Sequence, residues 1–279
     1  MNKFGFTTER EMPEVQNQDA LKKIYDSQAV SENKVILFAD TFNINFENKN
    51  LIYAIKVLNK FKYQAVIPSF GGDKLKRPLC CGRTYISYGQ LDKAAAELSR
   101  FNDYIIKNNY YNLPVVGIEP SCLLTFNDEY QSLKNINNRE KIKNKFYLLE
   151  EFILERIKND DDIKKNNFDQ NVLIHGHCHQ KSQNRMKGLT DLLSELNIKN
   201  KMIESSCCGM AGSFGYGSKN YEVSKKMANL SLIPAINNSD EKDFIIANGT
   251  SCRHQISDLS QKKGKHISEL LFQIFETVN

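Results

Sequence analysis

Short apolar runs alternate with amphipathic stretches along most of the chain, and this alternation predicts strands and helices in turn. The run VILFAD at residues 35–40 is followed by a stretch at 50–63 whose apolar residues recur at helical spacing. A second run at 65–70 precedes a segment rich in helix formers at 88–106, and a third at 114–122 passes from strand into loop. Strands that alternate with helices predict a parallel α/β sheet with right-handed crossovers.

The second half of the chain repeats this order of elements. Strand-then-loop segments are expected at 171–180, 201–209 and 243–252, with helices at 188–197 and 220–236 between them. The predicted fold class is therefore α/β, with two pseudo-repeated domains that each contain a small, mostly parallel sheet flanked by helices.

A charged stretch near 155–168 supplies the boundary between the repeats. The predicted division is a polar leader or linker at 1–34, a first repeat at 35–165 and a second repeat at 166–279.

Composition narrows the class of protein. The chain has 279 residues, of which 41% are hydrophobic and 25% charged, as in a soluble globular protein. Its apolar runs stop far short of the roughly 20 residues that a transmembrane helix needs, and its first residues lack the apolar core of a secretory signal. Net charge is +5, with lysines scattered among asparagines and acids, which argues against nucleic-acid binding. We expect a cytoplasmic protein.

Cysteine spacing is the most informative motif. The triplet Cys-Cys-Gly occurs at 80–82 and at 207–209. Cys122 follows Cys81 by 41 positions (122 − 81), and Cys252 follows Cys208 by 44 (252 − 208). Adjacent cysteines rarely bond to each other, because their Cα atoms lie about 3.8 Å apart, but both sulfurs can reach one metal or cluster. In a reducing compartment seven cysteines favour metal binding or catalysis over structural disulfides.

These cysteines follow apolar runs, so they are expected at the carboxyl edge of the sheets, where α/β proteins bind ligands. The second half supplies four, which we predict to be metal ligands: Cys178, Cys207, Cys208 and Cys252. The first half supplies three further candidate cofactor-binding residues, Cys80, Cys81 and Cys122, with Thr41 at the place of Cys178 when Val35 is aligned with Val172. Four thiolates are the usual ligand set of an iron–sulfur cluster, so the second half is the better candidate for a complete site.

Three other interpretations stay open. The cysteines can be buried structural residues, which behave as small hydrophobes. His175, His177 and His179 alternate around Cys178, so an extended segment would place all three on one face and favour a zinc-binding structural or regulatory module. Cys207 and Cys208 can also serve a metal-free thiol–disulfide oxidoreductase.

Polar residues near the cysteines are candidates for supporting roles. His177, His179 and His254 can donate hydrogen bonds to sulfur or carry protons, and Arg253 can offset the negative charge of a thiolate-bound cluster. Glu119 precedes Pro-Ser-Cys and can be a ligand, a proton acceptor or a turn residue.

Several strings resemble a known family. CCGRTYISYGQLDKA, GIEPSCLLTF, LIHGHCHQKS, ESSCCGMAGSFGY and ANGTSCRHQI look like the cysteine-rich CCG region found in heterodisulfide reductase, in the iron–sulfur subunit of anaerobic glycerol-3-phosphate dehydrogenase and in lactate-utilisation proteins. The likeness is strongest to the C-terminal region of FAD-linked dehydrogenases that oxidise D-2-hydroxy acids such as D-lactate or D-2-hydroxyglutarate, and it covers roughly residues 35–275.

The resemblance implies an iron–sulfur electron-transfer subunit or fragment, with a cluster of the [4Fe–4S] type. FAD would belong to a separate flavoprotein partner, a quinone is a candidate acceptor, and the chain would not oxidise a hydroxy acid by itself. Such a subunit would be peripheral to the inner membrane face through its partners. In the family's Cys-x-x-Cys tail, Cys122 and Cys252 match the last cysteine, whereas Glu119 and Gly249 stand where the earlier cysteine would be.

Overall fold

The computed structural model describes residues 5–68, 70, 75, 77–158 and 168–276, and it divides into two compact units. We call Gln16–Arg156 the first unit, and Met1–Val15 together with Ile157–Asn279 the second unit. The predicted boundary at 165/166 lies outside the described residues, and the predicted domain assignment stays a prediction.

The first unit is built on a four-stranded sheet with the order β2-β1-β3-β4, in which every neighbouring pair is parallel. Its strands are β1 (Lys34–Phe38), β2 (Gln64–Val66), β3 (Val115–Gly117) and β4 (Phe146–Leu148). Its helices are α1 (Asp19–Asp26), α2 (Thr41–Asn45), α3 (Asn48–Lys60), α4 (Arg83–Ser87), α5 (Leu91–Lys107), α6 (Pro120–Asn127), α7 (Glu129–Ser132), the 3-10 turn η2 (Arg139–Lys141) and α8 (Leu149–Ile157).

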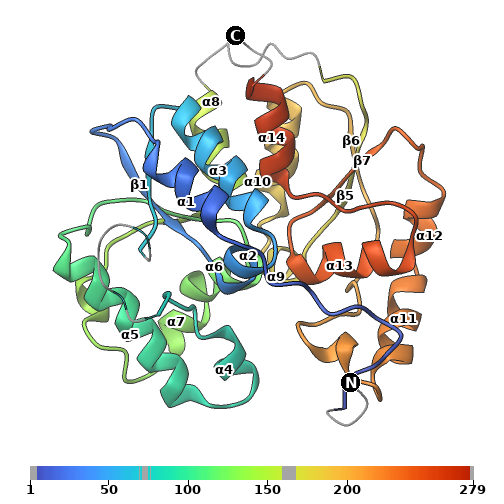
Figure 1. Ribbon diagram of the computed structural model, residues 1–279, viewed down its shortest axis with the longest axis horizontal. Coiled ribbons are helices and arrows are strands. Elements are labelled where there is room, and N and C mark those ends of the chain that lie inside the picture. Colours follow the sequence, from blue (N-terminus) through green and yellow to red (C-terminus); the bar gives the residue numbers. More distant parts are fainter. Residues whose placement is uncertain (1–4, 69, 71–74, 76, 159–167, 277–279) are drawn as a thin grey trace. The chain divides into compact units, whose positions relative to one another are not determined.

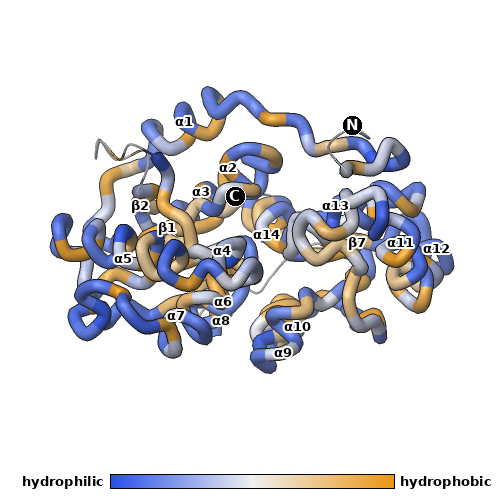
Figure 2. Tube along the Cα trace, turned by 90° about the horizontal axis from the view of Figure 1, so that it is seen from below, coloured by the Kyte–Doolittle hydropathy of each residue, from blue (hydrophilic) through white to orange (hydrophobic). Residues whose placement is uncertain are grey.

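Burial of the apolar runs explains these elements. Figure 2 shows hydrophobic colour along β1, whose residues 35–38 are at most 2% exposed. In α5 the buried residues Ala94, Leu98, Phe101 and Ile105 recur every three or four positions, so one face of the helix packs on the core. Phe38 meets Phe101 and Phe126 edge-on, which joins β1 to α5 and α6.

The second unit is built on a three-stranded parallel sheet with the order β6-β5-β7. Its strands are β5 (Val172–His175), β6 (Asn200–Met202) and β7 (Phe244–Ala247). Its helices are α9 (Cys178–Ser182), α10 (Met186–Glu195), the 3-10 turn η3 (Phe214–Tyr216), α11 (Tyr221–Asn229), α12 (Leu232–Asn237), α13 (Thr250–Leu259) and α14 (Ile267–Glu276). In Figure 1 the three strands run side by side, with α10 and α12 on opposite sides of them.

In both units the first strand is central and is flanked by the second and third strands, β1 by β2 and β3, and β5 by β6 and β7. This shared order supports the predicted pseudo-repeat, which stays a proposal. The predicted α/β class with two small parallel sheets is confirmed.

Some elements differ from the prediction. The helix expected at 220–236 is two helices, α11 and α12, because Pro234 has no N–H to donate to the carbonyl four residues earlier and its ring clashes there. α1 and β4 were not predicted. Among the described residues, no helix combines the length and the apolar character needed to cross a bilayer.

Candidate metal centre

Three loops at one edge of the second unit's sheet carry its four cysteines. Cys178 begins α9 three residues after the end of β5, and Cys252 lies in the first turn of α13, directly after β7. Cys207 and Cys208 lie in the loop that leaves β6. The strands are parallel, so all three loops leave the same edge, as the sequence predicted.

The cysteine side chains meet there. The ligand atoms of His175, Cys208 and Cys252 all lie within 4.8 Å of one another, and all three residues are buried. The Cys208 thiol hydrogen-bonds with both Cys252 and Cys207, and Cys207 also contacts Cys178, which is exposed. We call this continuous set of five side chains the sulfur array.

Hydrogen bonding within the sulfur array separates thiols from thiolates. The hydrogen bond from Cys178 holds the pKa of Cys207 far below its ordinary value, and the one from Cys208 does the same for Cys252. Conversely, the hydrogen bond with Cys207 raises the pKa of both Cys178 and Cys208. Hydrogen bonding therefore favours the anionic form of Cys207 and Cys252, and a thiolate is the form of cysteine that binds a metal.

Contacts before and after the two cysteines fix the backbone of the Cys-Cys-Gly loop. Gly209 has φ +90°, and a Cβ there would lie 2.3 Å from the carbonyl oxygen of Ser224, so only glycine fits. The Gly209 N–H points to the Cys207 sulfur at 3.3 Å. From α9, the Lys181 ammonium donates to the carbonyls of Ser205, at 2.5 Å, and Ser206. These contacts fix the turn that presents both sulfurs.

The three alternating histidines lie where β5 passes into α9. His175 ends β5 and its Nδ1 contacts the Ser205 hydroxyl at 2.9 Å. The backbone is still extended at His177, which caps α9 by accepting the N–H of His179 and stacks on that ring, with 5.5 Å between the ring centroids. Burial lowers the pKa of His177 to about 4, so its imidazole is neutral at pH 7.

The His177 ring occupies the space beside Gly249. A Cβ at position 249 would lie 2.3 Å from His177 Cδ2 and 3.4 Å from the Cys252 sulfur. A cysteine at this position would therefore displace the imidazole.

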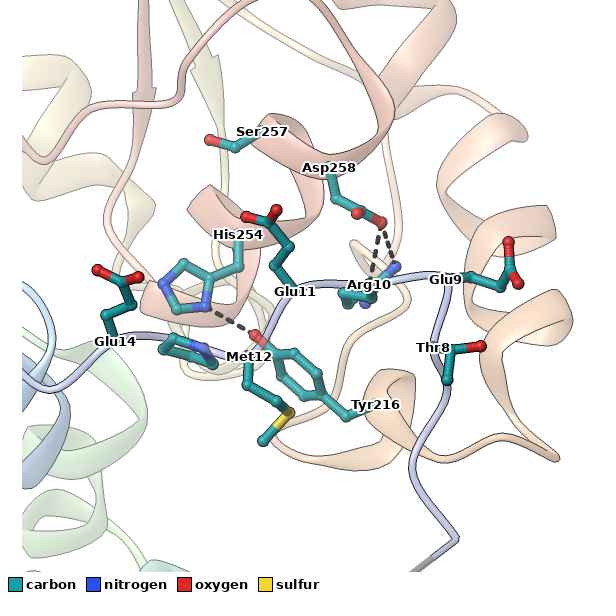
Figure 3. A pocket seen from close by; sticks show the side chains of 11 residues that line it. Thr8, Glu9, Arg10, Glu11, Met12, Glu14, Tyr216, His254, Ser257 and Asp258 are labelled. Carbon is teal, nitrogen blue, oxygen red and sulfur yellow. Dashed lines mark hydrogen bonds and ion pairs between the residues drawn. The ribbon is translucent and has the colours of Figure 1, made fainter. Parts of the chain in front are cut away.

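The other predicted supporting residues lie around α13. Arg253 is buried and donates to the carbonyls of Ala247 and Asn248 at 2.8 and 2.7 Å, which ties α13 to the end of β7. His254 contacts the Tyr216 hydroxyl at 2.9 Å and lines a pocket of about 970 Å³ formed with residues 8–14, Ser257 and Asp258 (Figure 3). Its role beside a metal stays a prediction.

The first unit brings its three cysteines together in apolar surroundings. Cys81 and Cys122 are buried and hydrogen-bonded to each other, and Cys80 is half-buried beside Cys81. The hydrogen bond to Cys122 raises the pKa of Cys81, and the one to Cys81 raises the pKa of Cys80. Cys122 accepts a hydrogen bond from Cys81, yet burial raises its pKa to about 11. All three sulfurs are therefore protonated thiols at neutral pH.

Two buried carboxyl groups border these thiols. Glu119 caps α6 by accepting the Ser121 N–H at 3.3 Å. It also accepts from the Ser121 hydroxyl at 2.7 Å and is 3% exposed. Asp40 caps α2, and burial, together with the charge of Glu119, raises its pKa to about 7. Buried carboxyl groups therefore border the cysteines of the first unit, whereas His175 lies beside those of the second unit.

The donor set of the second unit suits a thiophilic metal. Thiolate and imidazole ligands bind zinc and iron–sulfur clusters, whereas carboxylate oxygen is typical of magnesium and calcium sites. The ligand set predicted from the sequence did not include His175, which lies next to Cys208 and Cys252. The available signal was its place at the end of an apolar run, on the edge where the cysteines gather.

Comparison with known proteins agrees with this site. Residues 172–257 match the family CCG, "Cysteine-rich domain". The chain is 22% identical over 257 residues to one subunit of the anaerobic glycerol-3-phosphate dehydrogenase of Escherichia coli, covering 90% of this chain and 62% of that protein.

Two further relatives are D-2-hydroxyglutarate dehydrogenases. The Pseudomonas putida protein is 21% identical over 256 residues, with 91% of this chain and 23% of that protein covered. The Pantoea ananatis protein is 24% identical over 273 residues, with 89% and 23% covered. This chain therefore spans less than two thirds of the length of each of these relatives. The matched residues 172–257 contain all four cysteines of the sulfur array.

Proposed function

We propose that this protein is an iron–sulfur electron-transfer component of a dehydrogenase whose flavin is carried by a separate partner. The observation that supports this most is the sulfur array, because four cysteines from three loops converge with His175 in a largely buried place. Such convergence is costly unless the thiolates are neutralised by a cation. An iron–sulfur cluster, when bound, supplies one-electron transfer.

The protein's own residues would hold and shelter this centre. Cys207, Cys208 and Cys252 would be ligands, with Cys178 at the exposed side and His175 as a nitrogen donor. Lys181 and the Gly209 N–H would fix the loop, and the buried position of Cys208 and Cys252 would exclude water from one side of the centre. The exposed Cys178 marks the side from which electrons would enter or leave.

The partner follows from the names of the relatives. They are part of a glycerol-3-phosphate dehydrogenase and D-2-hydroxyglutarate dehydrogenases, which supports an oxidoreductase component. We further propose that the substrate oxidised by the flavoprotein is a D-2-hydroxy acid, that the cluster is of the [4Fe–4S] type and that the acceptor is a quinone. The first unit is proposed to hold no cluster, because its three cysteines have raised pKa values and are bordered by carboxyl groups.

Anaerobic purification of the full chain tests the proposal. We expect iron and acid-labile sulfide in equal amounts, broad absorption near about 400 nm from thiolate-to-iron charge transfer, and an electron paramagnetic resonance signal in one redox state. Full occupancy of folded protein by another metal, without sulfide, would contradict it. Reconstitution with iron and sulfide, followed by desalting, guards against loss during purification.

A second candidate function rests on the close approach of three ligand atoms. His175, Cys208 and Cys252 lie within 4.8 Å of one another, which is within reach of a single tetrahedral zinc ion. This alternative predicts a colourless protein with one zinc per chain. The metal and sulfide analysis described above separates the two candidates.

A further inference from the structure

The amino-terminal residues 5–15 are part of the second unit. Phe6 forms an antiparallel bridge with Gly217, and the Thr7 N–H donates to the carbonyl of Tyr216 at 2.8 Å. The Ser218 N–H donates back to the carbonyl of Gly5 at 2.9 Å. Figure 3 shows the segment running across α13, with Arg10 directed to Asp258. We call these residues the amino-terminal strap.

Arg10 anchors the strap in the protein interior. It is 4% exposed, and its Nε donates to Asp258 at 3.0 Å. Its guanidinium lies over the rings of Tyr216 and Tyr221, 5.6 and 5.2 Å from their centroids, and Nη1 contacts the sulfur of Met210. A buried guanidinium is tolerated only when it is paired and hydrogen-bonded, so these contacts are specific.

One partner of Arg10 also touches the Cys-Cys-Gly loop. Arg10 Nη2 donates to the Oε1 of Gln255 at 2.6 Å, and Nε2 of the same amide donates to the Cys208 carbonyl at 2.8 Å. A guanidinium can only donate, so the Gln255 amide must turn its oxygen to Arg10. Its NH₂ group is then directed to Cys208 and to the Ser224 carbonyl at 3.0 Å.

Gln255 and Arg10 also lie against the two residues that follow Cys208. A Cβ at position 209 would lie 3.1 Å from Gln255 Nε2, and Met210 contacts Arg10 itself. Arg10 and Gln255 therefore support the backbone from Cys208 to Met210. The Lys181 contacts hold a different part of the loop, the carbonyls of Ser205 and Ser206, which precede Cys207 in the chain.

We propose that Arg10 is a positioning residue for the metal centre: acting through Gln255, it sets the backbone that aims the Cys208 sulfur at Cys252 and His175. The inference rests on the proposed function only where it concerns a bound cluster. In the metal-free protein it concerns the position and accessibility of Cys208 itself.

The test compares Arg10→Met, Gln255→Glu and the double variant in the full chain, with Glu11→Gln, on the same strap and exposed, as the control. Gln255→Glu keeps the acceptor for Arg10 but cannot donate to Cys208. Two properties are measured: the midpoint potential and electron paramagnetic resonance spectrum of the iron-loaded protein, and the alkylation rate of Cys208 in metal-free protein, read by peptide mass spectrometry.

We expect Arg10→Met and Gln255→Glu to alkylate at Cys208 several-fold faster than the parent and to share a shifted potential and spectrum. The double variant should add little, since both residues act on one backbone segment. Arg10→Lys, which keeps one donor, should be intermediate. Glu11→Gln should match the parent.

If Arg10 only stabilised the fold, these measurements would come out differently. If Arg10→Met lowers the melting temperature but leaves the potential, the spectrum and Cys208 alkylation unchanged, the inference is overturned. If the parent protein binds no iron, the proposed function fails, and alkylation alone then decides whether Arg10 positions Cys208. Should Arg10→Met not fold, Gln255→Glu and Arg10→Lys carry the same test.

Discussion

The two units place their sulfur sites at equivalent points of their sheets. At the carboxyl end of the central strand, Phe38 pairs with Gly117 in the first unit, and His175 pairs with Ala247 in the second. Counting forward from these pairs, Thr41 stands at the place of Cys178, and Asp40 at that of His177. Glu119 corresponds in the same way to Gly249. Each unit then continues into a helix that carries its last cysteine.

The surroundings of these positions differ in kind. Phe38 packs against Phe101 and Phe126 and offers no donor, whereas His175 contributes a nitrogen beside two sulfurs. In the first unit the pKa of all three thiols is raised, and in the second hydrogen bonding lowers the pKa of two of the four. The comparison teaches that clustered cysteines can differ in how readily they form the thiolate that binds a metal. Neighbouring donors must stabilise the anionic sulfur.

The largest expected effect is on bound iron, and it should differ between Cys208→Ser and Cys81→Ser, which change the second cysteine of each Cys-Cys-Gly triplet. Cys208→Ser removes the sulfur that joins Cys207 to Cys252, so we expect nearly all bound iron to be lost. Cys81→Ser, at the equivalent place in the first unit, should leave the iron content unchanged. Iron and sulfide per folded chain, with circular dichroism to confirm folding, measure both. Equal losses in the two variants would remove the distinction between the units.

Thiol reactivity should differ by a large factor. Cys80 and Cys207 are both half-buried, so access is similar, but hydrogen bonds raise the pKa of Cys80 and lower that of Cys207. In metal-free protein at pH 7, iodoacetamide should modify Cys207 at least about tenfold faster. Peptide mass spectrometry after a short pulse gives the two rates, and unfolded protein, in which they should be alike, is the control. Similar rates in the folded chain would contradict the assignment of thiolate and thiol.

The pH dependence of stability should expose the buried acid of the first unit. The pKa of Asp40 is raised by burial from 3.8 to about 7, so the folded state favours its protonated form. This contribution is fully present below about pH 4 and is lost as the pH rises through about 7. Relative to Asp40→Asn, the parent should lose about 1.4 kcal/mol of unfolding free energy per pH unit in this window.

Denaturant titration of the metal-free chain between pH 4.5 and 8 measures this slope. Asp26→Asn, at the exposed end of α1, is the control and should keep the parent's slope. Parallel curves for the parent and Asp40→Asn would show that Asp40 is ionised in the folded protein.

The smallest effect concerns the pair His177 and Gly249. Gly249→Ala forces a Cβ to 2.3 Å from the His177 ring and should cost about 1–3 kcal/mol of unfolding free energy. The double variant His177→Ala/Gly249→Ala removes the clash and should recover most of this loss. Thermal unfolding of the metal-free variants measures it. The first unit accommodates a larger residue, Glu119, at the equivalent position because Asp40 is smaller than histidine.

Much of the fold was predictable because buried parallel strands give short, continuous apolar runs. Strands β1, β5 and β7 are of this kind, and Cys178 and Cys252, which follow β5 and β7, could be assigned to one edge without coordinates. The edge strand β4 runs directly into α8, which begins at Leu149, so its apolar residues merge with the helical pattern that follows. The separation of α11 from α12 was signalled in the sequence by one residue, Pro234.

The site was predictable as a set of cysteines, and less so in its other donors. Alternation predicted the three histidines on one extended segment, and the helix α9, which begins at Cys178, places His179 in its first turn. The role of Arg10 could not be predicted, because local sequence patterns give no information about partners up to 248 positions away.

The discontinuous make-up of the second unit has a kinetic consequence. Arg10 leaves the ribosome 245 residues before Gln255, its hydrogen-bond partner. At ~5–20 residues per second, the strap waits roughly 10–50 s for the helix that receives it. Metal insertion into a finished site would therefore follow translation. A shortened gene that starts at residue 157 would encode the four cysteines of the sulfur array but not Arg10.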